Sequence, residues 1–257
     1  MLAANGLLRP QRHRIARAAP RRCETTTFAG DSVRLIGWWC RADGVPRGTV
    51  VYLHGVGDNR GSASGPIERL TALGFDVIAY DSRAHGDSDG DVCTYGYFEK
   101  RDLERVLDRV EARPIVLFGA SLGAAVAIQE AAIDRRVSAV VAVEAFSDLR
   151  TVAIERAPRV LTRGMIAKAF AEAERQGQFE VDAVSPVRAA ANVTVPVLLV
   201  HGARDVDTRP AHSERVFAAL AGPKRLIVVP DAAHNGSLTA PVWTAIEAWI
   251  DAIAPAR

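Results

Sequence analysis

Short apolar runs, each stopped by glycine or a polar residue, recur along this chain of 257 residues. Such runs are typical of strands buried on both faces of a sheet. Segments with apolar residues at helical spacing lie between them. This alternation predicts an α/β fold, with a mostly parallel central sheet and helices on both faces. The predicted strands are residues 32–40, 49–53, 76–80, 114–118, 137–143, 195–200 and 225–229.

One long segment interrupts the alternation of strands and helices. Helices are predicted around residues 67–73, 103–110, 124–133, 216–220 and 242–253, but residues 146–192 contain no buried strand and are rich in Ala, Glu and Arg. An insertion between two strands of one sheet lies over the strand ends, where ligands bind in such folds. We therefore expect a small helical lid here, with inert packing as the alternative.

Composition limits the classes of partner. Hydrophobic residues make up 49% of the chain and charged residues 24%, which is typical of a globular protein with a sizeable core. The formal charge is only +2, and much of the positive charge lies in the first 24 residues. The sequence therefore predicts no nucleic-acid partner, and one domain over residues 25–257.

The basic leader, residues 1–24, could act as a membrane-surface tether, a targeting segment or a flexible arm. Its apolar part precedes its arginines, the reverse of a secretory signal, so we expect a flexible leader on a cytoplasmic protein. Membrane contact through this leader stays open. Three widely spaced cysteines, Cys23, Cys40 and Cys93, predict free thiols, with neither a disulfide framework nor a metal site.

The strongest local motif is Gly-Ala-Ser-Leu-Gly at residues 119–123. It follows an apolar strand and precedes an alanine-rich helix, which is the context of a Gly-x-Ser-x-Gly nucleophile elbow. The sharp turn strains the serine backbone and crowds its neighbours, so glycine is needed two residues away on each side. The turn also directs the first amides of the helix at the site, where they can stabilise negative charge. The motif predicts Ser121 as a nucleophile.

A serine nucleophile needs a base, and the base needs an acid that orients it. Of the six histidines, His234 alone lies in the loop after the last predicted strand. Asp205 lies in the loop after the preceding strand, with Asp207 nearby and Glu144 at the end of an earlier strand as alternatives. The order Ser, Asp, His along the chain is the one expected of an α/β-hydrolase triad.

With these motifs, the chain resembles the α/β-hydrolase superfamily over most of residues 25–255, and is most similar to serine hydrolases of esterase, lipase and serine-aminopeptidase-like type. Supporting motifs are Leu-His-Gly-Val at 53–56 and His-Gly-Ala-Arg-Asp at 201–205. A third, at 80–88, has Ala84 where the family more usually has glycine. The resemblance implies an oxyanion hole formed by the backbone amides of Val56 and Leu122.

The expected function is hydrolysis of a carboxylic ester through an acyl-enzyme on Ser121, with a small-molecule acyl substrate and no cofactor. A peptidase or a thioesterase would use the same triad, and so would not be distinguished by it. A catalytically silent binding protein on a hydrolase fold is the third alternative. We expect Asn59, Arg83 and Asp87 to brace loops near the site. The sequence leaves the oligomeric state open.

Overall fold

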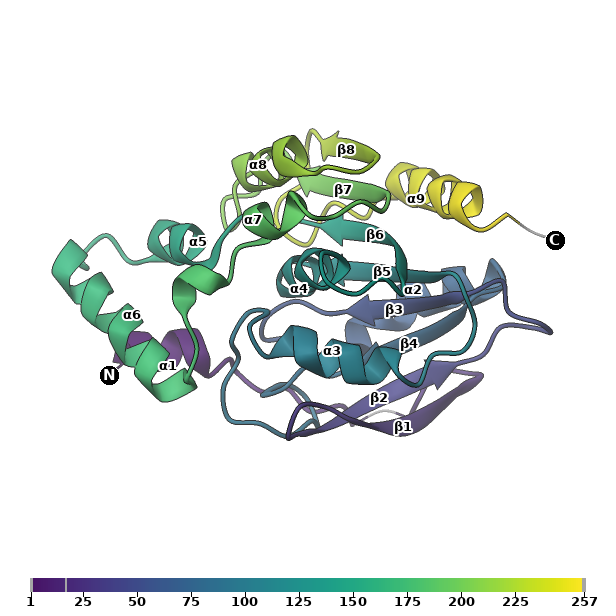
Figure 1. Cartoon of the computed structure of the whole chain (residues 1–257), viewed down its shortest axis with the longest axis horizontal. Coiled ribbons are helices and arrows are strands. Elements are labelled where there is room, and N and C mark those ends of the chain that lie inside the picture. The colour runs from purple at the N-terminus through teal and green to yellow at the C-terminus, as the bar shows by residue number, and fades with distance from the viewer. Residues whose placement is uncertain (1, 17, 256–257) are drawn as a thin grey trace.

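A single sheet forms the centre of the computed structural model, which describes residues 2–16 and 18–255 (Figure 1). Within those residues the sheet has eight strands in the order β1-β2-β4-β3-β5-β6-β7-β8. The strands are β1 (Cys23–Ala29), β2 (Arg34–Cys40), β3 (Thr49–Leu53), β4 (Asp76–Tyr80), β5 (Ile115–Ala120), β6 (Val137–Val143), β7 (Val197–Gly202) and β8 (Lys224–Val229).

Strand direction brings the ends of six strands together. β1, β2 and β4 are joined by antiparallel pairing, whereas β4, β3, β5, β6, β7 and β8 run parallel to one another. Every residue of β3 and β4 is buried, as expected for strands covered on both faces. The loops that follow these six parallel strands therefore leave the same edge of the sheet, where α/β folds place their sites.

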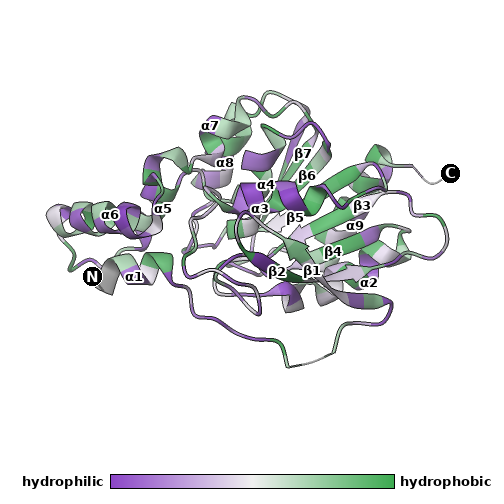
Figure 2. Cartoon of the chain, turned by 60° about the horizontal axis from the view of Figure 1, so that its bottom comes forward, coloured by the Kyte–Doolittle hydropathy of each residue, from purple (hydrophilic) through white to green (hydrophobic). Residues whose placement is uncertain are grey.

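Helices cover both faces of the sheet. Apolar residues of α3, α4 and α8 pack on one face, and those of α2 and α9 pack on the other. The mixed apolar and polar sides of these helices are visible in Figure 2. Their bounds are α2 (Ser64–Ala72), α3 (Glu99–Leu107), α4 (Leu122–Ala131), α8 (Ala211–Ala219) and α9 (Ala240–Ile253), with a short 3-10 turn η1 (Arg60–Ala63) before α2.

The predicted fold class is confirmed, and each predicted strand overlaps an observed one. β1 was not predicted, because its sequence, Cys-Glu-Thr-Thr-Thr-Phe-Ala, is mostly polar. Only Phe28 of this strand is buried, since β1 lies at the edge of the sheet. Edge strands with one exposed face lack the continuous apolar run that marks the central strands.

The segment predicted to be a lid contains α5 (Leu149–Arg156), α6 (Arg163–Gly177), η2 (Val181–Ala183) and α7 (Pro186–Ala190). α5 and α6 extend beyond one end of the sheet (Figure 1). Thr162 caps the N-terminus of α6, because its side chain accepts a hydrogen bond from the backbone amide of Met165.

The N-terminal segment differs from the expectation of a flexible arm. Residues Leu2–Leu8 form helix α1, which packs against α6. Ala4 and Leu8 are buried in a cluster with Phe170 of α6. Beyond α1, the Arg12 guanidinium donates hydrogen bonds to the backbone oxygens of Ser88 (2.7 Å) and Gly90 (2.6 Å). Ala4 and Leu8 thus belong to the apolar cluster of α5 and α6.

The prediction of three free thiols is wrong. Cys23 and Cys40 form a disulfide, and Cys93 is the buried free cysteine of the described residues. The two bonded cysteines lie directly opposite each other in the antiparallel pairing of β1 with β2. Their separation along the sequence gave no sign of this pairing, because β1 itself was not predicted.

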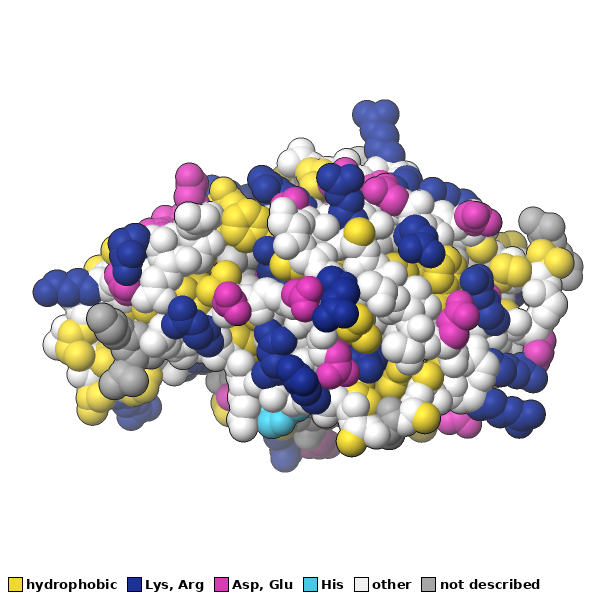
Figure 3. Space-filling model, turned by 90° about the horizontal axis from the view of Figure 1, so that it is seen from below, with side chains coloured by type: hydrophobic (Ala, Val, Ile, Leu, Met, Phe, Trp, Pro, Cys, Tyr) yellow, Lys and Arg dark blue, Asp and Glu magenta, His cyan; other side chains and the backbone are white. Residues whose placement is uncertain are grey.

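Surface charge is of mixed sign. On the face shown in Figure 3, Lys and Arg side chains are interspersed with Asp and Glu side chains. Among the helices of residues 2–16 and 18–255, none has the length and apolar character needed to span a membrane.

Candidate active site

Ser121 occupies the sharp turn between β5 and α4. Its backbone has φ 50° and ψ −109°, in the left-handed half of conformational space that residues with a side chain rarely adopt. The Ser121 amide donates to the carbonyl of Val143 on β6 at 2.8 Å, which holds the turn against the sheet. A strained residue fixed in this way is characteristic of functional sites.

The two flanking glycines are required by close contacts. A Cβ at Gly119 would collide with the backbone of Gly123 and Ala124, and a Cβ at Gly123 would collide with Leu53 of β3. The turn can therefore form only where both side chains are absent. This agrees with the physical reason for the motif given above.

His234 and Asp205 are brought together by the loops after β8 and β7. His234 Nδ1 lies 2.6 Å from Asp205 Oδ2. Because a carboxylate only accepts hydrogen bonds, Nδ1 carries the proton and donates it to Asp205. Nε2 is left as the basic nitrogen, the tautomer that a general base requires.

Asp205 is itself held by several donors. The backbone amides of Asp207 and Thr208 donate to its Oδ1 at 2.9 and 2.8 Å, and His201 Nε2 lies 3.4 Å from Oδ2. Burial alone would raise the pKa of Asp205, but the hydrogen bonds from His201, His234 and Thr208 hold that pKa well below its usual range. Asp205 is therefore ionised near neutral pH.

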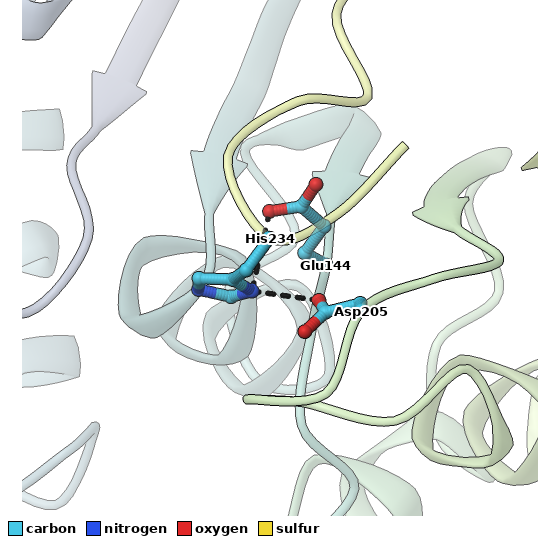
Figure 4. A group of neighbouring side chains, drawn as sticks. All are labelled: Glu144, Asp205 and His234. Atoms are coloured by element: carbon cyan, nitrogen blue, oxygen red, sulfur yellow. Dashed lines mark hydrogen bonds and ion pairs between the residues drawn. The ribbon is translucent and has the colours of Figure 1, made fainter. Parts of the chain in front are cut away.

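Glu144 supplies a second carboxylate beside His234. It follows β6, has a φ of 56°, and places Oε2 3.4 Å from His234 Nδ1 (Figure 4). It also accepts hydrogen bonds from the Asn235 amide (2.6 Å) and the Ser237 hydroxyl (2.5 Å), so it anchors the loop that carries His234. Burial lowers the pKa of His234, but the hydrogen bond to Asp205 and the charges of Asp205 and Glu144 outweigh burial and raise that pKa.

Among the described residues, these same three side chains form the one group whose donor atoms lie close enough together to hold a metal ion. One ligand atom from each of Glu144, Asp205 and His234 lies within 4.8 Å of the others. Each already takes part in the hydrogen bonds just described, and the His234 nitrogen facing the carboxylates carries a proton. The donor set therefore fits an acid–base cluster better than a cation site.

Ser121 and His234 line one pocket of about 650 Å³ at the strand ends. Val56 also lines it, and Leu122 is the first residue of α4, directly after Ser121. A Cβ added to Gly55 would lie 3.6 Å from the Ser121 Cβ, so the His54–Gly55 turn lies against the serine. The amides of Val56 and Leu122, predicted to form an oxyanion hole, thus belong to the two turns that flank Ser121.

Buried ion pairs brace the loops around the pocket. Arg83 donates to Asp102 at 2.7 and 2.8 Å, and Arg60 pairs with Asp81 and with Asp87. The Asn59 side chain accepts from the Gly61 amide at 2.8 Å and so caps η1. These contacts agree with the bracing role expected for Asn59, Arg83 and Asp87.

Sequence reasoning did not single out every residue that lines the pocket. Asp58, Arg156 and Ser237 also line it, although none belongs to a recognisable motif. Arg156 comes from the end of α5, and its guanidinium donates to the Asp207 carbonyl (2.7 Å) and the Thr208 hydroxyl (2.8 Å). Only the fold brings this lid residue to the loop that carries Asp205.

Comparison with known proteins gives the same fold. The chain is 30% identical over 210 residues to the uncharacterized protein Rv2307c of Mycobacterium tuberculosis, covering 80% of this chain and 69% of that protein. It is 27% identical over 226 residues to the uncharacterized protein YfhR of Escherichia coli K12, covering 84% and 74%. In structure it is similar to the esterase Pf2001 of Pyrococcus furiosus, with a TM-score of 0.72, 22% identity, and coverage of 95% of this chain and 97% of that one.

The match to a family extends across most of the chain. Residues 50–248 match the model of the alpha/beta hydrolase family. This range begins in β3 and ends in α9, so it includes the elbow, helices α5 and α6, and the loops of Asp205 and His234. The chain therefore belongs to the alpha/beta hydrolase family.

Proposed function

We propose that this protein is a serine hydrolase that cleaves a carboxylic ester by way of an acyl-enzyme. The observation that carries the proposal is the hydrogen bond of 2.6 Å from His234 Nδ1 to Asp205, beside a strained Ser121 in the same pocket. Ser121 attacks the acyl carbonyl while His234 Nε2 takes its proton. The same histidine then protonates the leaving alcohol and activates the water that releases the acid.

The electrostatics of the site support this sequence of proton transfers. Asp205 stays ionised and stabilises the imidazolium that forms when Ser121 attacks. Negative charge on the carbonyl oxygen would be stabilised by the backbone amides of Val56 and Leu122, where losing one donor typically costs about 2.7–4 kcal/mol of barrier. The similar Pyrococcus furiosus protein is named an esterase, which is consistent with an ester substrate.

The aminopeptidase alternative requires acidic groups that hold a substrate amine. Glutamates of the segment between β6 and β7 are engaged elsewhere: Glu172 pairs with Arg175, and Glu174 accepts from the Val181 amide at 3.0 Å. Glu155 lies 3.3 Å from His212 Nε2. We therefore favour an ester over a peptide with a free amine.

The test is labelling by a fluorophosphonate together with hydrolysis of p-nitrophenyl esters, in the wild type and in Ser121→Ala. We expect the substitution to abolish labelling and to lower kcat by about 10⁶, as removing a triad nucleophile does. Labelling without ester turnover would move the search to peptides or thioesters. Neither signal in a folded wild-type protein would overturn the proposal and favour the silent binding protein.

A further inference from the structure

A second cavity lies between the lid and the N-terminal helix. Its volume is about 660 Å³, within the range that holds a small-molecule ligand. Aliphatic and aromatic side chains of α5 and α6 form most of its wall, among them Leu149, Val152, Ile166 and Phe170. Tyr95 also lines the cavity, and its hydroxyl donates a hydrogen bond of 2.9 Å to the Leu7 carbonyl, so the ring is the part left to contact a ligand. Such a lining suits a hydrocarbon chain.

This apolar cavity adjoins the pocket of Ser121. Val56 and Arg156 line both spaces, and they are the residues shared by the two described linings. The Arg156 guanidinium is turned to the Asp207 carbonyl and the Thr208 hydroxyl, so its charge is placed at the junction. A ligand whose carbonyl oxygen binds the Val56 amide would therefore have the apolar cavity directly beside it.

The position of His234 determines which half of an ester enters the apolar cavity. His234 must protonate the leaving oxygen, so the alcohol lies on the His234 side of Ser121. On that side Glu144 Oε2 lies 3.4 Å from His234 Nδ1, and Asp207 belongs to the loop of Asp205, so carboxylates make the surrounding polar. The acyl chain would then leave the carbonyl in the other direction, toward Val56, which lines both spaces.

Helix α1 forms part of the wall of this cavity through Gly6 and Leu7. It is fixed there by burial of Ala4 and Leu8, and by a hydrogen bond of 2.8 Å from the Cys93 amide to the Leu8 carbonyl. A Cβ at Gly6 would meet no atom within 4 Å. A larger side chain at Gly6 can therefore be accommodated, in the space that the ligand would use.

We propose that this cavity is the acyl-chain subsite, closed on one side by helix α1, and that the preferred substrates are esters of medium-chain carboxylic acids. The inference rests on the proposed esterase function and assigns its acyl group. From the apolar lining we expect medium-chain acyl groups to be preferred over acetate. Each methylene that becomes buried should raise kcat/KM by about fourfold until the cavity is filled.

The experiment measures kcat/KM for p-nitrophenyl esters from acetate to palmitate, in the full chain and in Gly6→Phe. We expect Gly6→Phe to lower the ratio of kcat/KM for the octanoate ester to that for the acetate ester by about tenfold. Gly164→Phe is the matched control, because Gly164 is also a helical glycine with no atom within 4 Å of an added Cβ, and it lies outside the described lining of the cavity. Ala153→Phe, which fills the same cavity from α5, should repeat the effect.

Ligand binding to an inactive variant tests the acyl subsite without measuring turnover. In Ser121→Ala, decanoate should bind, and adding Gly6→Phe should weaken its binding while adding Gly164→Phe should not. A wild-type preference for acetate with Ser121 still labelled by fluorophosphonate would overturn the acyl subsite and leave the esterase standing. An unchanged octanoate-to-acetate ratio in both Gly6→Phe and Ala153→Phe would do the same. Failure of Ser121 to label would instead remove the proposed function itself.

Discussion

The pocket of Ser121 and the apolar cavity, which share Val56 in their linings, differ in how their side chains are held. At the strand ends, hydrogen bonds hold Glu144, Asp205 and His234, and the sheet fixes the two carboxylates: Glu144 follows β6, and Asp205 follows β7. At the lid end, apolar side chains of α1, α5 and α6 surround a cavity of about 660 Å³. Hydrogen bonds have directions and apolar packing does not. The strand ends therefore suit chemistry, and the lid suits selection of a chain by its size.

The comparison implies that the two tasks separate under mutation. Substitutions at the strand ends should change the rate for every ester by the same factor, whereas those in the lid cavity should change the ranking of esters. Three substitutions test this separation, beginning with the one that should lower the rate most.

Asp205→Asn should lower kcat by about 10⁴ for all chain lengths, because an amide would hold His234 in the wrong tautomer. The octanoate-to-acetate ratio should stay unchanged, as measured with the p-nitrophenyl series. Asp207→Asn is the control, since Asp207 contacts Asp205 through its backbone amide rather than its carboxylate. A larger loss of kcat in Asp207→Asn than in Asp205→Asn would show that Asp207, and not Asp205, is the acid of the triad.

Glu144→Gln should lower kcat by about tenfold, because the loop of His234 loses part of its anchor. It should also move the acid limb of the kcat/KM profile to lower pH. The sign follows from the His234 pKa, which Glu144 raises: without that charge, His234 becomes neutral, and therefore basic, at a lower pH. A merely structural Glu144 would leave the limb in place, as should the control Glu155→Gln, which removes a lid carboxylate.

Arg156→Met should have the smallest effect, about threefold on kcat/KM, from the loss of its two hydrogen bonds to the loop of Asp205. Because Arg156 contacts both regions, we expect it to change both the rate and the octanoate-to-acetate ratio. Arg156→Lys keeps the charge but not the planar fork, so its kcat/KM should lie between those of the wild type and Arg156→Met. An effect on the rate alone would show that the two regions act independently.

The central strands and the elbow could be predicted because local sequence determines them. β3 and β4 are buried on both faces and so are continuous apolar runs, and the elbow needs glycine at positions 119 and 123 whatever surrounds it. The proximity of Asp205 to His234 also followed from topology, since both loops leave one edge of a parallel sheet. These features depend on short stretches of chain or on strand order.

The N-terminal elements could not be predicted, because their stability comes from distant residues. Helix α1 contains Asn5 and Gly6, both poor helix formers, and its burial depends on α6, more than 150 residues away. β1 is mostly polar, so neither it nor the disulfide it carries left a local pattern. The apolar cavity was missed for the same reason, since its wall combines α1 with the distant helices α5 and α6.

The left-handed backbone at Ser121 places the protein's proposed chemistry in conflict with its durability. Glycine would adopt this conformation without the strain, on the order of 1–3 kcal/mol, that serine carries here. That is a sizeable share of the ~5–15 kcal/mol that keeps a typical domain folded. A directed-evolution library screened for heat resistance alone would therefore favour loss of Ser121, so an engineer would need to select for turnover and thermal tolerance together.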